Sequence, residues 1–190
     1  MPADKKQIDQ LLAAASEGNA VKVLKLIKSG AKINAKDKDG FDALLSSLNY
    51  SAYKINNGQF DKWIDVIKIL LENGADINTR YKKYGNRTAL IHASEFGIFP
   101  AVKFLLESGA DIHLKDQYQA SALHRAALYG HYEVVKFLLE NGAEVNSRTD
   151  DGETALKWAK EGEKDAQKSK SPDSENFAET VRILKGFGAK

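Results

Sequence analysis

Residues 116–146 read DQYQASALHRAALYGHYEVVKFLLENGAEVN, and this stretch decides the fold. It contains a short segment that ends in two alanines, 123–127, then Gly130, then the apolar run 134–139, and it closes on a Gly-Ala pair. In the apolar run the hydrophobic residues recur at the i, i+3 and i+4 spacing of one buried helix face. The stretch therefore predicts a short helix, a tight turn, a longer helix and a loop.

The Gly-Ala pair recurs along the chain and marks an internal repeat. Its glycines are Gly30, Gly74, Gly109, Gly142 and Gly188. Their spacings of 44, 35, 33 and 46 residues indicate a base period of 33 residues with extra residues at three places. Glycine after the second helix suits a left-handed C-cap, and Thr or Ser at the next helix start can cap its exposed amides. We therefore expect similar helical units stacked on one another.

This pattern resembles the ankyrin repeat, Asp-x-x-Gly-x-Thr-Pro-Leu-His-x-Ala-Ala followed by Gly, Val-Val, Leu-Leu and Gly-Ala. The positions that match it are Asp116, Ser121, Leu123, His124, Ala126, Ala127, Gly130, Val134, Val135, Leu138, Leu139, Gly142, Ala143 and Asn146. The resemblance covers nearly the whole chain, with two departures. Alanines replace the usual proline (Ala43, Ala89, Ala122 and Ala155), and Gln119 replaces a turn glycine. The resemblance implies an all-α ankyrin-repeat solenoid of stacked helix-turn-helix units with projecting loops.

We expect a single domain over 1–190, built from five units. Their predicted bounds are 4–36, 37–80, 81–115, 116–148 and 149–190. The first unit lacks the Thr-Pro-Leu-His-like start and the last ends at Ala189-Lys190, so both are interpreted as caps.

Two insertions interrupt the period. Residues 46–60 either form a packed elbow, in which aromatic side chains fill a local core, or protrude as a partner contact; those side chains are Tyr50, Tyr53, Phe60 and Trp63. Residues 161–176 are rich in Lys, Glu, Asp and Ser, contain Pro172 and show no apolar period. We expect them to be a solvated, mobile loop between the helix of Trp158 and a final helix over 177–185.

Composition narrows the function classes. With 43% apolar residues and no apolar run near the length of a membrane span, the chain is expected to be soluble. Its 28 basic and 26 acidic residues are spread along the sequence, so it lacks the basic stripe of a nucleic-acid binder. The absence of cysteine excludes disulfides, thiol catalysis and Cys-based zinc sites.

The compartment stays open. The first 30 residues lack a signal-peptide pattern and belong to the first repeat, so a cytoplasmic location is one alternative. The other alternative is a periplasmic or exported bacterial protein. Met1 is the only methionine, which is also the pattern expected of a mature exported chain that has been given a new start codon.

The sequence offers little for catalysis. Three of its four histidines, His113, His124 and His131, occupy repeat positions, and a structural role accounts for them. Phosphate-binding glycine loops, zinc-protease motifs and nucleophile elbows are absent. We therefore predict no catalytic residue, no metal ion and no cofactor.

Partner contacts are expected at the loop tips and at exposed positions of the short first helices, as the ankyrin resemblance implies. Tyrosine and arginine at a rigid tip are typical interface anchors. The predicted protein-binding residues are Arg80, Tyr81, Lys83, Tyr84, Arg87, Phe96, Gln117, Tyr118, Gln119, Tyr129 and Trp158. Alternatively, some of these rings pack between repeats.

The leading functional prediction is a non-catalytic, monomeric module that binds one protein partner and neither nucleic acid nor membrane. A rigid array loses little conformational entropy on association. Steric inhibition or masking of the partner is the specific expectation, for example as an immunity or antitoxin-type inhibitor of an enzyme from the same cell. The alternatives are a scaffold or secreted effector that recruits a host protein, and an enzyme with an unrecognised site.

Overall fold

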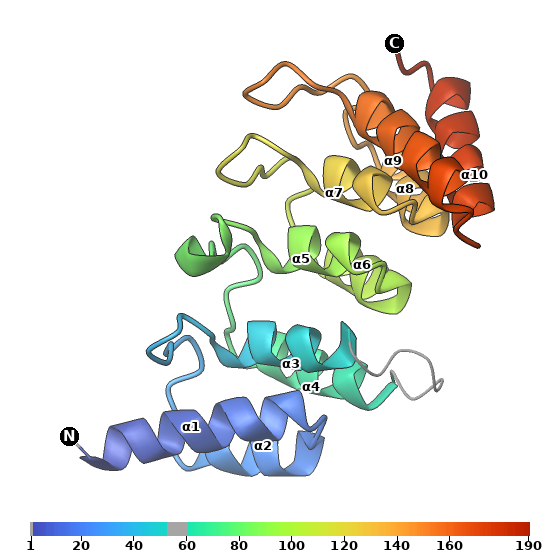
Figure 1. The fold of residues 1–190 in the computed structure, drawn as a ribbon. Coiled ribbons are helices and arrows are strands. Elements are labelled where there is room, and N and C mark those ends of the chain that lie inside the picture. Colours follow the sequence, from blue (N-terminus) through green and yellow to red (C-terminus); the bar gives the residue numbers. More distant parts are fainter. Residues whose placement is uncertain (1, 53–60) are drawn as a thin grey trace. The chain divides into compact units, whose positions relative to one another are not determined.

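The computed structural model describes residues 2–52 and 61–190 (Figure 1). Within these ranges the chain is all-α, and extended backbone forms only isolated bridges such as Lys115 with Ser121. No helix in the described ranges is long and apolar enough to cross a membrane. The chain divides into two compact units, Met1–Tyr84 and Gly85–Lys190. The prediction of a single domain over 1–190 stays a prediction.

The first unit contains two helix-turn-helix pairs. Its elements are α1 (Pro2–Ser16), α2 (Ala20–Lys28), α3 (Ala43–Ala52), α4 (Asp61–Glu72) and the 3-10 turn η2 (Lys82–Tyr84). Helix α1 packs on α3 and α2 packs on α4, so the two pairs form adjacent layers. Trp63 of α4 is buried, and its indole N–H donates to the carbonyl oxygen of Ser16 at 3.0 Å. Trp63 is therefore part of the core of this unit.

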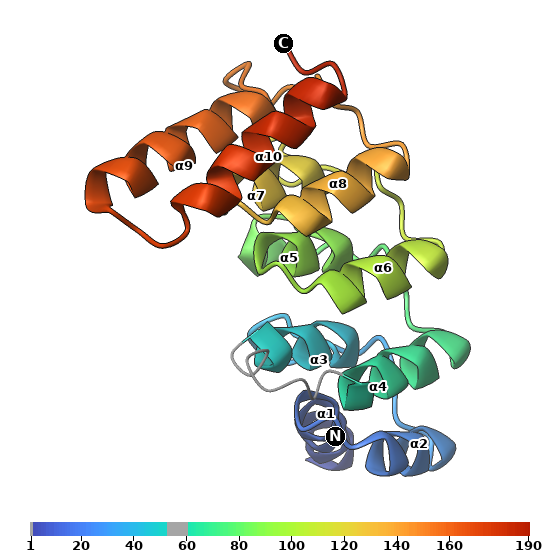
Figure 2. The ribbon, with the colours of Figure 1, turned by 90° about the vertical axis from the view of Figure 1, so that its right-hand side faces the viewer.

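The second unit contains three further pairs (Figure 2). Its helices are α5 (Ala89–Glu95), α6 (Phe99–Glu107), α7 (Ala122–Leu128), α8 (Tyr132–Glu140), α9 (Ala155–Ser169) and α10 (Ser174–Gly186). The first helices α5, α7 and α9 pack in one row, and the second helices α6, α8 and α10 pack in another. Buried alanines such as Ala93, Ala126 and Ala159 allow the first helices to approach closely. The predicted succession of helix pairs is confirmed.

The predicted helix ends are also confirmed. All five glycines of the Gly-Ala pairs have left-handed backbone, with φ between 87° and 93°. The hydroxyl oxygens of Thr88 and Thr154 accept hydrogen bonds from the backbone N–H of Ile91 and Lys157, and so cap α5 and α9.

The turns before α3, α5, α7 and α9 each contain a left-handed residue at the same repeat position. Glycine fills it at Gly40 and Gly152, whereas Asn86 (φ 58°) and Gln119 (φ 55°) fill it in the two middle loops. A residue with a Cβ atom is strained there, and glycine relieves that strain.

We therefore expect Gln119→Gly to raise the free energy of unfolding by about 0.5–1 kcal/mol, because relief of strain exceeds the entropy that glycine adds to the unfolded chain. Chemical denaturation measures the change. Gln119→Ala is the control, since it removes the side chain but keeps the Cβ. An equal gain in both variants would contradict the backbone explanation.

The prediction of a mobile loop over 161–176 is wrong. Helix α9 continues to Ser169, and Lys170, which is left-handed at φ 53°, ends it. Helix α9 lies along α10, where the ring of Phe177 occupies the space beside Gly162 that a Cβ atom would fill. Packing of one exposed helix against the next thus overrides the polar composition of this segment.

The insertion in the second repeat lies partly outside the described residues. Helix α3 extends to Ala52 and is three residues longer than α5 or α7. Residues 53–60 and the side chains of 49–52 lie outside the described part of the chain. The alternatives for this insertion therefore stay open, apart from the buried position of Trp63.

Candidate protein-binding face

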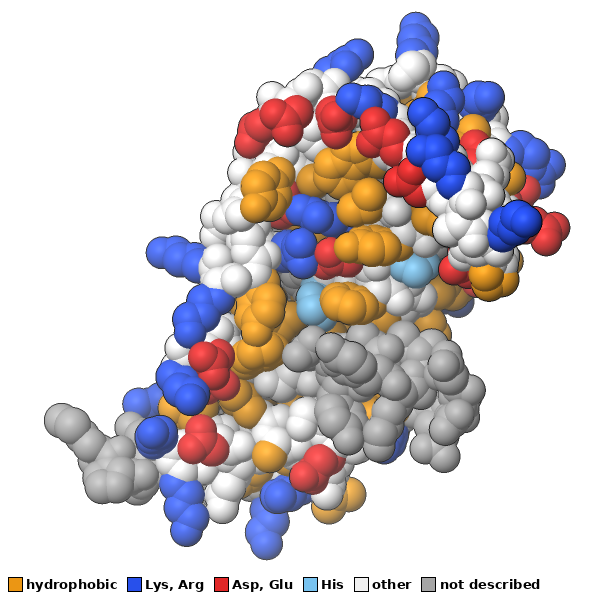
Figure 3. Space-filling view, viewed as in Figure 1, with side chains coloured by type: hydrophobic (Ala, Val, Ile, Leu, Met, Phe, Trp, Pro, Cys, Tyr) orange, Lys and Arg blue, Asp and Glu red, His pale blue; other side chains and the backbone are white. Residues whose placement is uncertain are grey.

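The first helices of the second unit and the loops that precede them present exposed aromatic side chains. Phe96, Tyr118 and Tyr129 are 42%, 55% and 49% exposed. Over α5, α7 and α9, Figure 3 shows hydrophobic side chains with charged side chains and histidine between them. We call Phe96, Tyr118, Tyr129 and the half-buried Trp158 the aromatic face.

Arg125 of α7 contacts two members of this face, Tyr118 and Trp158. Its Nε donates to Oδ2 of Asp116 at 2.9 Å, and its Nη2 contacts the same oxygen. The other oxygen of Asp116 accepts the backbone N–H groups of Tyr118 and Ala120, at 2.9 and 3.0 Å. Both charged side chains are buried. The ion pair therefore fixes the loop that carries Tyr118 to helix α7.

Two rings flank the Arg125 guanidinium. Its central carbon lies 5.8 Å from the ring centroid of Tyr118 and 5.6 Å from that of Trp158, which is cation–π geometry. Trp158 also packs edge-on against His124 at 5.4 Å, and its indole N–H contacts Glu153. These contacts hold Tyr118 and Trp158 in place before any partner binds.

The charge network extends towards α5. Arg125 lies 4.0 Å from Glu95, and Glu95 accepts a hydrogen bond from Arg87 at 2.5 Å. His92 is 4% exposed, and neither of its ring nitrogens has a hydrogen-bond partner. Burial, and secondarily the charge of Arg87, lower the pKa of His92 to about 4. His92 is therefore neutral at pH 7, with its ring 4.8 Å from that of Phe96.

The buried His124 and the half-buried His131 have structural contacts, as expected. His124 lies 2.9 Å from the hydroxyl of Ser121, and His131 lies 2.9 Å from the carbonyl oxygen of Glu95. Burial lowers the pKa of both imidazoles. In the described part of the chain, no three His, Asp or Glu side chains lie close enough together to hold a metal ion.

One predicted anchor is wrong. Tyr81 is 1% exposed, and its hydroxyl donates to Oδ1 of Asp42 at 3.0 Å, so it belongs to the core of the first unit. Burial followed by the Asp42 charge raises the pKa of the Tyr81 hydroxyl. Because this hydroxyl donates to a buried acceptor, the ring lies in the core and not at the loop tip.

The other predicted residues of the first unit are at its surface. Arg80 is exposed, and Lys83 donates to the carbonyl oxygen of Lys38 at 2.6 Å. Tyr84 is half-buried, and its ring packs edge-on against Phe41 at 5.0 Å. That Tyr84 and Tyr129 contact the same partner stays a prediction, since the two residues belong to different units.

In the second unit, the remaining predicted residues surround the aromatic face. Gln117 and Gln119 are exposed in the loop of Tyr118, and the Gln117 N–H donates to the carbonyl oxygen of Gly85 at 2.7 Å. Arg87 is tied to Glu95. Arg125, which lies against the rings of Tyr118 and Trp158, is not among the residues predicted from the sequence. The nine-residue spacing from Asp116 to Arg125, a loop acid followed by a cation on the next helix, is the signal that points to it.

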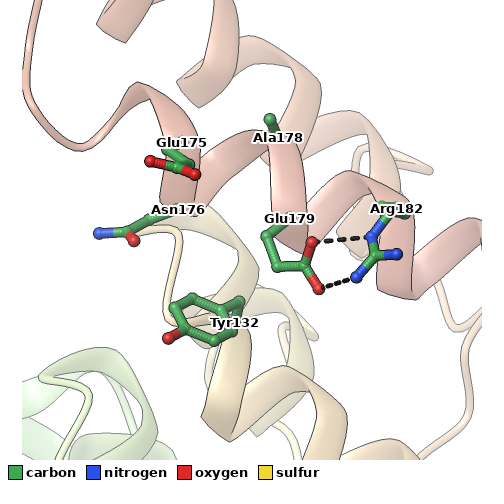
Figure 4. A pocket seen from close by; sticks show the side chains of 6 residues that line it. All are labelled: Tyr132, Glu175, Asn176, Ala178, Glu179 and Arg182. Carbon is green, nitrogen blue, oxygen red and sulfur yellow. Dashed lines mark hydrogen bonds and ion pairs between the residues drawn. The ribbon is translucent and has the colours of Figure 1, made fainter.

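A second surface lies between α8 and α10, on the row of second helices. It is an open hollow of about 530 Å³ (Figure 4), lined by Tyr132, Glu175, Asn176, Ala178, Glu179 and Arg182. Arg182 donates two hydrogen bonds to Glu179, at 2.6 and 2.7 Å, so its charge is already paired.

Comparisons with known proteins agree with this architecture. The family model described as ankyrin repeats (3 copies) matches residues 11–116, 48–149 and 111–168. A probable E3 ubiquitin-protein ligase of Oryza sativa subsp. japonica is 31% identical over 117 residues, which cover 61% of this chain and 20% of the relative. A putative ankyrin repeat protein of Acanthamoeba polyphaga mimivirus is 29% identical over 114 residues, 60% of this chain and 65% of the relative.

The B-cell lymphoma 3 protein homolog of Mus musculus is 34% identical over 114 residues, 60% of this chain and 22% of the relative. The match therefore spans less than two thirds of the length of each of these three relatives.

Proposed function

Because this chain belongs to the ankyrin repeat family, we propose that it binds one protein partner and that the contacts lie on the aromatic face of its second unit. Ankyrin repeats are typical of non-catalytic protein–protein interaction modules. The observation that carries the proposal is the exposure of Phe96, Tyr118 and Tyr129 along the row of first helices and their loops. Large rings beside a buried, fully paired arginine combine apolar contact area with a rigid support, as interface anchors require.

Preorganisation of Tyr118 supports this placement. The Asp116 carboxylate holds its backbone N–H and the Arg125 guanidinium flanks its ring. Tyr129 is similarly oriented, because its ring stacks on that of His131 with the centroids 6.1 Å apart. Binding therefore orders few side chains, which lowers its entropic cost.

We further propose that binding masks the partner, as an inhibitor of the immunity or antitoxin type does. The support is the geometry of the face. A row of helices with projecting loops can cover a broad area of a partner's surface. A closed pocket on a protein would enclose only a single chemical group of the partner. Binding and masking are separable, because masking also requires that the covered area contain or adjoin the partner's own working site.

The double variant Tyr118→Ser/Tyr129→Ser is expected to weaken partner binding by more than about ten-fold, because it removes two exposed rings. The variant should still unfold cooperatively. The measurement is affinity capture from the source organism's lysate with mass spectrometry, followed by titration calorimetry with the captured protein. The matched control is Tyr132→Ser/Phe187→Ser, which removes two exposed rings from the second helices.

A partner lost with the first variant and retained with the control would support the face. A partner retained equally by both variants would place binding elsewhere. Masking is tested separately by the activity of the captured partner in a one-to-one complex. Unchanged activity in that complex would overturn masking and leave binding intact.

A further inference from the structure

The loop tips beside the aromatic face are held next to each other. Tyr118 forms the tip of the loop before α7, and Asp150 and Asp151 form the tip of the loop before α9. The backbone N–H of Asp150 donates to the carbonyl oxygen of Tyr118 at 3.1 Å. An exposed ring and two exposed carboxylates therefore occupy neighbouring positions on the surface of the second unit.

The loop before α9 is acidic. The loop over 141–154 contains four acidic residues, Glu144, Asp150, Asp151 and Glu153, and one basic residue, Arg148. Arg148 donates to the carbonyl oxygen of Gly152 at 2.5 Å, and the nearby Lys157 pairs with Glu153 at 2.6 Å. In Figure 3, red side chains gather above the orange ones at this end of the face. We call this loop over 141–154 the rim. The rim lies beside Tyr118 and therefore presents negative charge to an incoming partner.

An aromatic ring beside carboxylates is suited to a guanidinium or an ammonium group. The ring attracts the cation through its face, and the carboxylate pairs with its N–H groups. The chain already holds one cation in this way, because Arg125 lies between the rings of Tyr118 and Trp158 and pairs with Asp116. Tyr118 is still 55% exposed, so part of its ring remains available.

We propose that the partner presents a basic segment, rich in arginine or lysine, to Tyr118 and to the carboxylates of Asp150 and Asp151. The inference rests on the proposed function and adds the chemical class of the partner. Charge complementarity carries it: the rim is acidic, and the aromatic rings beside it favour cations over anions. An acidic protein segment is disfavoured by the same charges.

Two tryptophans make the test specific. Trp158 belongs to the aromatic face and Trp63 is buried in the first unit, so the two indole N–H signals of the nitrogen-15-labelled full chain report on different places. The ligands are a soluble Arg-Gly repeat peptide and a Glu-Gly repeat peptide of the same length. We expect the Arg-Gly peptide to shift the Trp158 signal, to leave Trp63 unmoved, and to bind more weakly as salt is raised. The Glu-Gly peptide should shift neither signal.

Charge-neutral variants separate this inference from the proposed function. Asp150→Asn/Asp151→Asn is expected to weaken Arg-Gly binding by about five-fold or more, since it removes both rim carboxylates. Glu107→Gln/Glu140→Gln changes net charge equally on the second helices and should have no effect. An Arg-Gly peptide that leaves Trp158 unmoved, or that binds both variants equally, overturns the basic-partner inference. The proposed function is contradicted only if the captured protein binds Tyr118→Ser/Tyr129→Ser as tightly as it binds the wild type.

Discussion

Replacement of Asp116 by alanine is expected to lower the free energy of unfolding by about 3–5 kcal/mol, the cost of leaving a buried charge without its partner. The Asp116 side chain is fully buried and neutralises Arg125, whose side chain is 9% exposed. It also accepts two backbone N–H groups, those of Tyr118 and Ala120. The variant therefore leaves two loop amides unsatisfied and leaves the buried guanidinium with only the longer contact to Glu95, at 4.0 Å.

A double-mutant cycle isolates the charge from the hydrogen bonds. Asp116→Asn keeps an oxygen acceptor for the loop amides and removes the charge, and Arg125→Met removes the cation while filling its volume. The double variant Asp116→Asn/Arg125→Met should be more stable than Asp116→Asn alone, since it no longer buries a guanidinium that has lost its close carboxylate partner. Urea denaturation followed by circular dichroism measures all three variants. Additive effects of the two single changes would contradict a coupled ion pair.

Much of the fold can be predicted from the repeat. Five glycines follow helices at positions where the repeat predicts left-handed backbone, and all five have left-handed backbone in the structure: Gly30, Gly74, Gly109, Gly142 and Gly188. Short-range rules of helix period and capping predict these features, because each depends on residues within one unit.

The failures have a different cause. Residues 161–169 are polar, so their own sequence predicts no packing partner, yet Gly162 and Ala166 lie where α9 meets α10. Tyr81 follows an arginine in a loop that looks exposed, but its hydroxyl reaches Asp42, 39 residues earlier in the chain. In both cases a contact with a distant segment decides the position, and the local sequence contains no sign of it.

The candidate site shows the same division. Exposure of Phe96, Tyr118 and Tyr129 follows from their repeat positions and is confirmed. Their role in binding stays a prediction. The ion pair of Asp116 with Arg125 joins a loop to the following helix, and only the fold shows that both side chains are buried together.

Acidification is expected to destabilise the protein through His92. Its pKa is about 4 in the folded chain and near 6.5 when solvated, so between these values the unfolded chain binds a proton that the folded chain does not. The free energy of unfolding should therefore fall as pH is lowered from about 6.5 to about 4, by about 3 kcal/mol from this residue. The loss is complete only below the lower value, because the folded chain then binds the proton as well.

His92→Leu separates this contribution from that of other groups. Leucine cannot be protonated and has no nitrogen to leave without a partner, whereas neither nitrogen of His92 is hydrogen-bonded. Urea denaturation at pH 7 and pH 4.5 gives the loss of stability for each protein, and the variant should lose less than the wild type. His124 and His131, whose pKa values are also lowered by burial, account for the histidine-dependent loss that remains. His113→Gln is the control, since this histidine is exposed. Equal losses in the wild type and His92→Leu would show that His92 is not protonated on unfolding in this range.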